Sequence, residues 1–358
     1  MYIKDLSVLN FRNIKDTKVE LSENINIFYG DNAQGKTNFL EAIYVCSIGR
    51  SQRTKFDSQL IKFGYDEAHI RTFVVRKNYS GRIDVHLKKS VKKGMAINGM
   101  PARKISEFLG NLITVIFSPE DLRLVKGSPS ERRKFMDLEI CQLSKIYCYD
   151  LQQYYKVLKQ RNNLLKSHIR DKSYYDTLDV WDMQLSDYGE RIIKKREEFI
   201  RDVNLISKNI HANITDNKEE LRMEYESSVE KDSFLEKITN SRDRDIALGS
   251  TNIGPHKDDI IFFINDNDTK LYGSQGQQRT AALSAKLAEV ELIRQEIGEN
   301  PVLLLDDVLS ELDENRQRFL INNIENLQTF ITCTGIEGSI YKSFRKSTMY
   351  NIKNGEIV

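Results

Sequence analysis

The chain has 358 residues, 40% of them hydrophobic, so it can bury a sizeable core and form two domains or one large one. Its 54 basic and 52 acidic residues leave a net charge of +2, which by itself excludes a strongly basic nucleic-acid binder; only a local basic surface can indicate such a partner. The four cysteines form no CxxC pair, so a zinc site and a disulfide framework lack support, and no apolar run reaches the roughly 18 residues of a membrane span. We therefore expect a protein of the reducing cytoplasm.

The two ends of the sequence predict an α/β structure. Four strand-like stretches come first: MYIKDLSVLNF, NINIFYG, HIRTFVVRKN and GRIDVHLKK. The last two are adjacent, and we expect Gly81 to form the turn of a hairpin between them. Near the other end, IIFFI, PVLLLDD and FITCT alternate with helix-forming segments, which is the α/β pattern.

The middle of the sequence predicts long helices, because no proline occurs between Pro129 and Pro255. Two stretches, LQQYYKVLKQRNNLLK and WDMQLSDYGERIIKKREEFIRDVNLI, show helical spacing of apolar residues. The expected core positions are Leu151, Tyr154, Tyr155, Leu158, Leu165, Leu185, Ile192, Phe199 and Val203. We predict one α/β head built from residues 1–117 and 250–358, with a helical arm lobe of residues 118–249 inserted between them.

The strongest local motif is GDNAQGKT, which matches the phosphate-binding pattern G-x-x-x-x-G-K-[ST]. Its glycines let consecutive N–H groups turn toward phosphate oxygens, and the helix that follows adds its dipole. The lysine would pair with the β and γ phosphates of a nucleotide, and the threonine hydroxyl would bind Mg²⁺. An ordinary glycine-rich turn is the alternative. The candidate nucleotide-binding residues are Gly30, Asp31, Asn32, Ala33, Gln34, Gly35, Lys36, Thr37 and Asn38.

A second motif, PVLLLDD, supplies carboxylates. The run 302–305 predicts a buried parallel strand, and Asp306 follows at its carboxyl end, where α/β sheets bind ligands. Asp306 would support Mg²⁺, and Asp307 would polarise the attacking water. Lys36, Asp306 and Asp307 are therefore the candidate catalytic residues. A capped strand-to-helix turn explains two aspartates equally well when the strand is taken alone.

A third motif, SQGQQ, opens a helix whose apolar face is Leu283, Leu287, Val290, Ile293 and Ile297. Ser274, Gln275, Gly276 and Gln277 at its N-terminus would form a further anion site. The alternative is an N-cap, in which Ser274 and Gln277 form a capping box.

These three motifs, in this order and with a helical insertion after the first, resemble the ABC-type ATPases of chromosome maintenance, the SMC-like group. The resemblance implies an ABC-type ATPase head with mixed sheets, in which SQGQQ is the signature motif and Ser310 to Asp313 form the D-loop. In that group the signature closes on a nucleotide held by a second subunit. The resemblance thus implies an ATP-dependent homodimer.

Within that group the sequence resembles the RecF family of recombination mediators over essentially its whole length. The resemblance is carried by LNFRN, SQRTKFDSQLI, FSPEDLRLVKGSPSERRKFMD, YYKVLKQRNNLLK and GPHKDDI. It implies a cytoplasmic, nucleoid-associated ATPase that uses ATP and Mg²⁺ and binds duplex DNA without sequence preference near single-strand gaps. With RecO and RecR it would help load the strand-exchange recombinase. Because Asp307 stands where many ABC enzymes carry glutamate, we expect slow hydrolysis.

Three residues can each be interpreted in two ways. Arg12 would lie near the phosphates, or it is a solvated arginine at a strand end. Glu120 would reach the metal, as the group's Q-loop does, or SPED is only a helix start with Ser118 as cap. His256 would contact the site, or it is structural.

Three basic clusters are candidates for DNA contact: Arg50, Arg53 and Lys55; Lys88, Lys89, Lys92 and Lys93; and Arg132, Arg133 and Lys134. Each is equally explained as a solvated face. The alternative function is the nucleotide-binding subunit of an ABC transporter or another SMC-like ATPase. Thr332 and Thr334 argue against a transporter, because they stand where transporters usually have a histidine.

Overall fold

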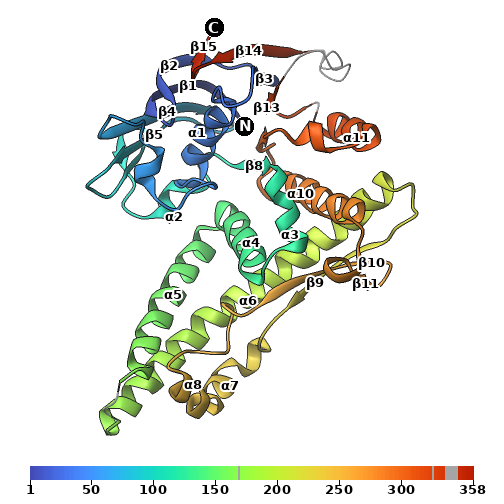
Figure 1. Ribbon diagram of the computed structural model, residues 1–358. Helices are drawn as coiled ribbons and strands as arrows, with labels where there is room; N and C mark the ends of the chain where they lie inside the picture. The colour runs from blue at the N-terminus through green and yellow to red at the C-terminus, as the bar shows by residue number, and fades with distance from the viewer. Residues whose placement is uncertain (168–169, 325, 335–345) are drawn as a thin grey trace. The chain divides into compact units, whose positions relative to one another are not determined.

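The computed structural model describes residues 1–167, 170–324, 326–334 and 346–358 (Figure 1). Contacts divide the chain into two compact units. The head unit consists of Met1–Asp121 and Glu289–Val358, so it is built from both chain ends. The arm unit is Leu122–Ala288, and residues 250–288 therefore cluster with the arm. The functional division at residues 117 and 249 stays a prediction.

The head unit contains an antiparallel sheet with the strand order β2-β1-β4-β5-β6-β7. Alternate residues of β4 are buried, so the sheet covers the core with one face and leaves the other to solvent. The strands are β1 Tyr2–Phe11, β2 Ile14–Glu20, β4 Glu67–Val75, β5 Ser80–Lys88, β6 Gly94–Ile97 and β7 Met100–Pro101.

The β4–β5 hairpin was predicted correctly, but its turn was not. The turn spans Arg76 to Tyr79, where the Arg76 N–H donates to the Tyr79 carbonyl at 2.8 Å. Gly81 instead lies inside β5, and a Cβ there would come within 3.2 Å of the Asn98 side chain. This glycine makes room for a neighbouring side chain, and Asn78 is the residue of the turn with the usual turn chemistry.

The second sheet of the head unit has the order β15-β14-β3-β13-β12-β8 and is parallel except for β15. Every residue of β12 and β13 is buried, which explains why β12 reads as a continuous apolar run and why β13 holds two threonines in the interior. The strands β8 and β14 were not predicted. The strands are β3 Ile25–Tyr29, β8 Thr114–Phe117, β12 Val302–Leu305, β13 Thr329–Cys333, β14 Ser347–Lys353 and β15 Glu356–Ile357.

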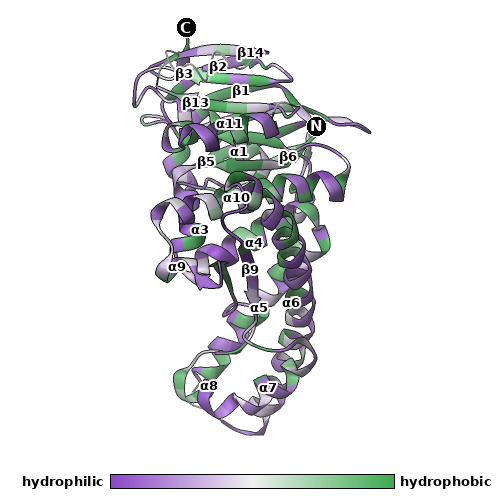
Figure 2. Ribbon diagram, turned by 90° about the vertical axis from the view of Figure 1, so that its right-hand side faces the viewer, coloured by the Kyte–Doolittle hydropathy of each residue, from purple (hydrophilic) through white to green (hydrophobic). Residues whose placement is uncertain are grey.

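Helix α1 (Lys36–Ile48) lies in the core of the head unit, and eleven of its residues are buried, so it is apolar on most sides. Figure 2 shows α1 and the strands near it largely in the hydrophobic colour. The other helical segments of this unit are η1 Asp57–Leu60, α2 Ile105–Phe108, η2 Pro119–Leu122, η4 Val308–Glu311 and α11 Glu314–Ile324. Helix α10 (Gln275–Ile297) begins in the arm unit and ends in the head unit.

The arm unit is built on the antiparallel pair α5 (Lys145–Leu165) and α6 (Lys172–Ile214). Leu158, Leu165 and the four core positions predicted on α6 are buried as expected, whereas Tyr155 is 43% exposed. Its other helices are α3 Arg123–Lys126, α4 Pro129–Leu143, η3 Lys231–Ser233, α7 Phe234–Asn240, α8 Arg242–Leu248 and α9 Thr269–Tyr272.

A three-stranded sheet completes the arm unit, in the order β11-β10-β9. The stretch IIFFI forms β10 as a strand, but it pairs in this sheet and not in a sheet of the head unit. Its burial alternates, as expected for an antiparallel strand with one covered face. The strands are β9 Leu221–Glu226, β10 Asp259–Ile264 and β11 Asn267–Asp268.

Buried ion pairs fix how the helices of the arm unit meet. Arg161 on α5 is fully buried and donates to Asp182 on α6 at 2.5 Å and to Asp245 on α8 at 2.7 Å. Removing one partner of such a set leaves an uncompensated buried charge, which typically costs about 3–5 kcal/mol. The four cysteines are buried, as expected for core thiols. In the described part of the chain, no helix combines the length and the hydropathy needed to cross a membrane.

Candidate nucleotide site

The loop between β3 and α1 has a conformation that requires its two glycines. Gly30 has φ 148° and Gly35 has φ 107°, both in the region that L side chains rarely adopt. A Cβ on Gly30 would lie 2.4 Å from the Ile352 carbonyl oxygen, and one on Gly35 would lie 2.5 Å from the Asn13 amide. Helix α1 starts at Lys36, so its free N–H groups and dipole face the loop. The loop thus has the strand, turn and helix that the motif predicted.

Lys36 is 5% exposed and folds back over the loop. Its Nζ donates to the carbonyl oxygens of Gly30 at 2.6 Å and of Asp31 at 3.0 Å. The ammonium group is therefore held among the residues that would surround a phosphate chain, and it can exchange carbonyl partners for phosphate oxygens, which bind it more strongly.

Asp306 lies at the carboxyl end of β12, and the structure brings it to Thr37. The Thr37 hydroxyl donates to Asp306 Oδ1 at 2.8 Å, and the Thr332 hydroxyl donates to the same oxygen at 2.9 Å. Because β12 lies between β8 and β13, Asp306 is buried. The sequence predicted that Thr37 and Asp306 lie on either side of the site. It indicated no contact for Thr332, which stands where transporters usually have a histidine.

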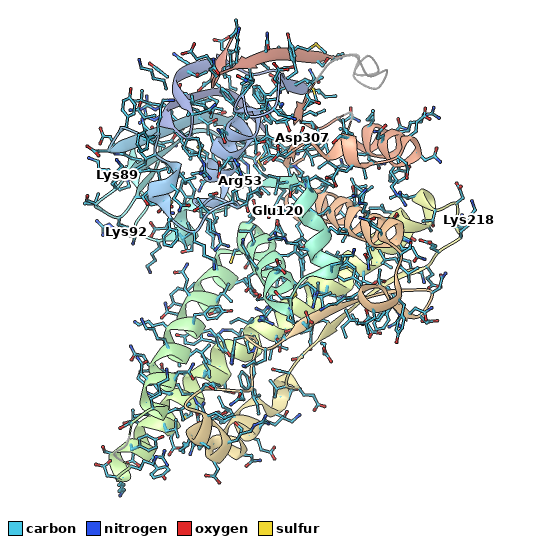
Figure 3. All side chains as sticks on the ribbon, viewed as in Figure 1. Arg53, Lys89, Lys92, Glu120, Lys218 and Asp307 are labelled. Atoms are coloured by element: carbon cyan, nitrogen blue, oxygen red, sulfur yellow. The ribbon has the colours of Figure 1, made fainter. Side chains whose placement is uncertain are left out.

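Asp307 follows in the left-handed conformation, with φ 53°. The Thr332 hydroxyl oxygen accepts its N–H at 2.9 Å. The pKa of the Asp307 carboxyl is raised, first by burial, which disfavours the charged form, and then by the negative charge of Asp306. Asp307 (Figure 3) is thus a more basic carboxylate than an exposed aspartate.

The oxygen donors of this site fit Mg²⁺. The ion prefers hard oxygen ligands and usually takes one or two carboxylates, with phosphate and water completing its shell. Thr37 Oγ1 and Asp306 Oδ1 are already 2.8 Å apart. Within the described residues, no group of three or more His, Cys, Asp or Glu side chains can hold a metal. With Thr37 and Asp306 as protein ligands, bound phosphate and water would complete the shell.

Glu120 lies on the same edge of the sheet. Strand β8 runs parallel to β12 and pairs Phe117 with Leu305, and Glu120 follows three residues after β8 ends. The segment also forms the helix start considered in the sequence analysis, because η2 begins at Pro119 and Asp121 Oδ2 accepts the Ser118 N–H at 2.8 Å. Asp121, and not Glu120, therefore caps the start of this helix. The position of Glu120 is labelled in Figure 3.

Asn13 braces the loop, although no sequence pattern indicates a role for it. Its Nδ2 donates to the Gln34 carbonyl at 3.0 Å, and its Oδ1 accepts from Asn38 Nδ2 at 2.8 Å. The Gly355 N–H donates to the same Gln34 carbonyl at 2.8 Å. The motif LNFRN contains Asn13, but nothing in that stretch indicates which side chain faces the loop.

Arg12 is held by a buried carboxylate. Its Nε and Nη2 donate to the two oxygens of Glu41 on α1, at 2.8 and 2.7 Å. Ser51 also donates to Glu41, at 2.6 Å, and Arg53 lies 3.4 Å from it. Arg12 is therefore neither freely solvated nor unpartnered. It is positioned by Glu41, for which no sequence motif indicates a role.

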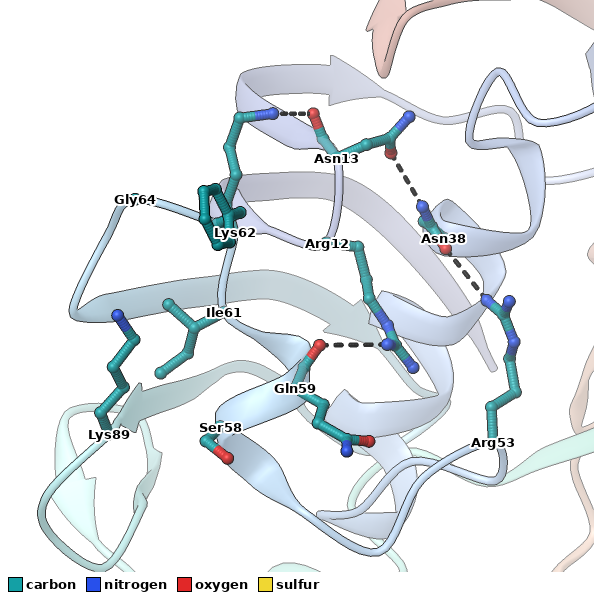
Figure 4. Close-up of a pocket in the computed structure, with 11 residues that line it drawn as sticks. Arg12, Asn13, Asn38, Arg53, Ser58, Gln59, Ile61, Lys62, Gly64 and Lys89 are labelled. Carbon is teal, nitrogen blue, oxygen red and sulfur yellow. Dashed lines mark hydrogen bonds between the residues drawn. The ribbon is translucent and has the colours of Figure 1, made fainter.

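A pocket of about 850 Å³ opens beside the loop (Figure 4). In Figure 4 a chain of hydrogen bonds leads from Asn13 through Asn38 to Arg53, whose Nη1 donates to Asn38 Oδ1 at 3.0 Å. Several lining side chains are cationic, which suits an anionic ligand. The pocket is lined by Arg12, Asn13, Asn38, Arg53, Ser58, Gln59, Ile61, Lys62, Phe63, Gly64 and Lys89.

The SQGQQ stretch belongs to the arm unit, where it caps its own helix. The Ser274 N–H donates to Gln277 Oε1 at 2.8 Å, and the Gln277 N–H donates to Ser274 Oγ at 3.2 Å, which is the capping box considered from the sequence. Gln277 also donates to Glu219 at 3.0 Å. Ser274 and Gln275 are exposed. Because Ser274 Oγ accepts the capping bond, its own proton stays available to a ligand.

His256 is structural. Its Nδ1 lies 2.7 Å from the Tyr154 hydroxyl, and its Nε2 lies 3.0 Å from the Thr251 carbonyl oxygen. Burial lowers the pKa of His256 from 6.5 to about 4, so the ring is neutral at pH 7. Both ring nitrogens are used within the arm unit, which answers the question left open by the sequence.

The basic clusters differ in how exposed their charged groups are. Arg132 is 3% exposed and forms a bidentate pair with Asp259, at 2.6 and 2.8 Å. Lys89, Lys92 and Lys93 lie in the loop between β5 and β6, where Lys89 pairs with Asp66 at 3.1 Å and Lys93 pairs with Asp57 at 3.0 Å. Lys89 and Lys92 are exposed and project from the rim of the head unit in Figure 3. The β5–β6 loop is therefore the better candidate for contact with a polyanion.

Comparison with known proteins identifies the family. The model described as RecF/RecN/SMC N terminal domain matches residues 2–356. The chain is 49% identical over 360 residues to DNA replication and repair protein RecF of Lachnospira eligens, covering 100% of this chain and 99% of the relative. The chain belongs to the RecF family. A second RecF, from Clostridium botulinum, is 48% identical over 363 residues, with 100% and 99% of the two chains covered.

Solved structures agree with this family. The structure described as the recombination mediator protein RecF-ATP in the RecFOR pathway is 39% identical, with a TM-score of 0.92, and the match covers 100% of this chain and 98% of that one. A Smc head domain from Pyrococcus furiosus has a TM-score of 0.58 at 14% identity, covering 100% and 96% of the two chains, and shares the fold alone. The predicted fold class, an ABC-type ATPase head with a helical arm, is confirmed.

Proposed function

We propose that this chain is an ATP-dependent DNA-binding protein of DNA replication and recombinational repair, and that it hydrolyses ATP slowly. The observation that carries the proposal is the contact between Thr37 and Asp306, because it joins a phosphate loop to a carboxylate in a chain of the RecF family. Two full-length relatives are named DNA replication and repair proteins, and a similar structure is named for ATP and for the RecFOR pathway.

ATP would bind with its phosphates in the loop from Gly30 to Thr37. Lys36 would transfer its hydrogen bonds from the Gly30 and Asp31 carbonyls to the β and γ phosphates. Arg12 and Asn38, which line the adjoining pocket, would lie near the phosphates. Thr37 and Asp306 would hold Mg²⁺, with Glu120 as a further candidate on the same edge of the sheet. The ion would neutralise charge on the phosphate oxygens.

Hydrolysis would use Asp307 as the general base. Its raised pKa makes it a better proton acceptor than an exposed aspartate, but its side chain is one methylene shorter than glutamate. A shorter reach to the attacking water, together with a backbone held at φ 53°, is the physical reason to expect slow turnover. ATP would then act as a switch whose bound state is long-lived.

A second copy of the chain would complete the site. Ser274, Gln275, Gly276 and Gln277 would face the γ-phosphate bound by the partner copy, where the Ser274 hydroxyl can donate its proton while still capping α10. Phosphate at a helix N-terminus is stabilised by free N–H groups and by the helix dipole. The homodimer would therefore form with ATP and separate after hydrolysis.

DNA would bind through backbone phosphates, without sequence preference. The β5–β6 loop carries lysines without the geometry for reading bases, and Arg132 is excluded by its burial against Asp259. We infer from the RecFOR description of the similar structure that RecO and RecR act with this chain at gaps, where they would load the strand-exchange recombinase. A cytoplasmic location at the nucleoid follows from such a role.

One experiment tests this proposal: duplex-DNA binding with ATP, ADP or no nucleotide, on wild type, Lys36→Ala and Ser274→Arg. We expect tight binding only for wild type with ATP. Equal binding by all three proteins in every nucleotide state would show that ATP does not gate DNA binding.

A further inference from the structure

Thr332 makes contact with both acids of the candidate site. It is the fourth residue of β13 and is 1% exposed. Its hydroxyl donates to Asp306 Oδ1 at 2.9 Å and accepts the Asp307 N–H at 2.9 Å. The register places it there, because Leu305 pairs with Ile331 in the parallel ladder, so Thr332 and Asp306 are the next residues on neighbouring strands.

The bond to Asp306 determines how that carboxylate is oriented. Thr37 and Thr332 come from distant parts of the sequence and both donate to Oδ1, at 2.8 and 2.9 Å. Two donors on one oxygen fix the rotation of the carboxylate about its terminal torsion, which is otherwise soft. If Thr37 turned its hydroxyl oxygen toward a metal, the Thr332 bond would still hold Asp306 in place.

The bond to Asp307 acts on the backbone. A non-glycine residue in the left-handed region is uncommon, and such a conformation persists only where the surroundings hold it. At Asp307, with φ 53°, the Thr332 hydroxyl accepts the N–H. The direction in which the Asp307 side chain leaves the backbone therefore depends on Thr332.

From these contacts we infer that Thr332 is a positioning residue, which orients Asp306 for the metal and Asp307 for the attacking water. This inference rests on the proposed ATPase function. Thr332 touches neither nucleotide nor water in this scheme; it acts through the two aspartates.

The test compares Thr332→Val, which removes the hydroxyl but keeps a β-branched side chain, with Thr332→Ser, which keeps the hydroxyl. Two quantities are measured: kcat for ATP hydrolysis, and the Mg²⁺ concentration that half-saturates the rise in affinity for a fluorescent ATP analogue. We expect Thr332→Val to lower kcat and to raise that Mg²⁺ concentration, each about tenfold or more, as for other residues that orient metal ligands. Nucleotide affinity without Mg²⁺ should not change, and Thr332→Ser should be close to wild type.

Thr329→Val is the matched control. It removes another buried hydroxyl from the same strand, one that donates to the Leu327 carbonyl at 3.2 Å, and it should leave both quantities unchanged. If Thr332→Val does not fold, Thr332→Ala removes the same hydroxyl with less bulk and is judged by the same measurements.

Two results would overturn the inference. Wild-type kcat and Mg²⁺ dependence in Thr332→Val would show that the hydroxyl has no part in positioning. An equal loss in Thr332→Ser would assign the effect to packing of the methyl group. A wild-type protein that neither binds nor hydrolyses ATP would instead refute the proposed function itself, so the two failures are distinguishable.

Discussion

Thr37 Oγ1 and Asp306 Oδ1 lie 2.8 Å apart, although 269 positions separate the two residues in the sequence. The first residue of this pair lies in the first turn of α1, and the second follows the buried strand β12. Their contact depends on the parallel sheet. Strand β13 lies between β3 and β12 and runs parallel to both, so β3 and β12 have their carboxyl ends at the same edge of the sheet. The fold therefore assembles a phosphate loop and a carboxylate from the two ends of the chain.

Replacing Lys36 with alanine should abolish nucleotide binding. Its ammonium would make two charge-assisted bonds to phosphate, worth about 1.5–3 kcal/mol each, so affinity should fall about a hundredfold or more. Titration with a fluorescent ATP analogue measures this loss. Lys270→Ala, at an exposed lysine of the arm unit, is the control and should bind normally. Wild-type affinity in Lys36→Ala would exclude the loop as the phosphate site.

Replacing Asp307 with asparagine should stop hydrolysis and spare ATP binding. General base catalysis typically contributes about 10²–10⁴-fold, so kcat should fall by at least about a hundredfold. In wild type, kcat should decrease as pH falls through the raised pKa of Asp307, because protonation removes the base. Asp216→Asn, at an exposed residue, should keep both rate and pH profile. Unchanged kcat in Asp307→Asn would assign the base to another group.

These site residues could be predicted because their signals are local. Spacing alone indicates the glycine loop, and an apolar run that ends in acids indicates a buried parallel strand. Asn13, Glu41 and Thr332 could not be predicted in this way. Their roles depend on which distant segment the fold brings beside them, and asparagine, glutamate and threonine are common at positions with no function.

The fold class could be predicted from the sequence, whereas the pairing of strands into sheets could be predicted only in part. The strand IIFFI was correctly expected, yet its partners are β9 and β11, because strand propensity does not say which sheet a strand joins. Gly81 was wrong as a turn residue because a strand glycine can also serve packing. Arg132 illustrates the same limit: a run of like charge does not reveal which member is buried against Asp259.

Acid should destabilise the fold through His256. Its pKa is about 4 when folded and near 6.5 when unfolded, so its contribution to stability is complete above pH 6.5 and is lost as pH falls toward 4. The full loss is about 3 kcal/mol at 1.36 kcal/mol per pKa unit, and part of it should appear between pH 7 and 5. Denaturant unfolding across that range measures it. In His256→Asn the slope with pH should be shallower; an identical slope would show that His256 does not contribute.

Removing the β5–β6 loop charges should weaken binding to duplex DNA. For Lys89, Lys92 and Lys93 changed together to alanine, the slope of log affinity against log salt should become less steep by about 0.9 for each DNA phosphate that the lysines no longer neutralise. Binding isotherms between low and moderate salt measure that slope. The control changes Lys156, Lys159 and Lys194, which are exposed on the arm helices. An equal effect in both variants would place the DNA-binding surface elsewhere.

In the proposed dimer, ATP joins two copies of the chain through Ser274, which Ser274→Arg should prevent. Its matched control is Ser144→Arg, because Ser144 also caps a helix, accepting the Tyr147 N–H at 3.2 Å. Losing either cap should cost about 1 kcal/mol of stability. Ser274→Arg and Ser144→Arg should therefore be equally stable, and only the first changes the residue that would face the partner's phosphate.

Light scattering of the full chain with Mg²⁺ and either ATP, ADP or no nucleotide measures whether this dimer forms. We expect a doubled mass with ATP for wild type and Ser144→Arg, and a monomer for Ser274→Arg, which still binds ATP. A wild-type mass that stays the same in all three conditions would show that ATP does not join two copies.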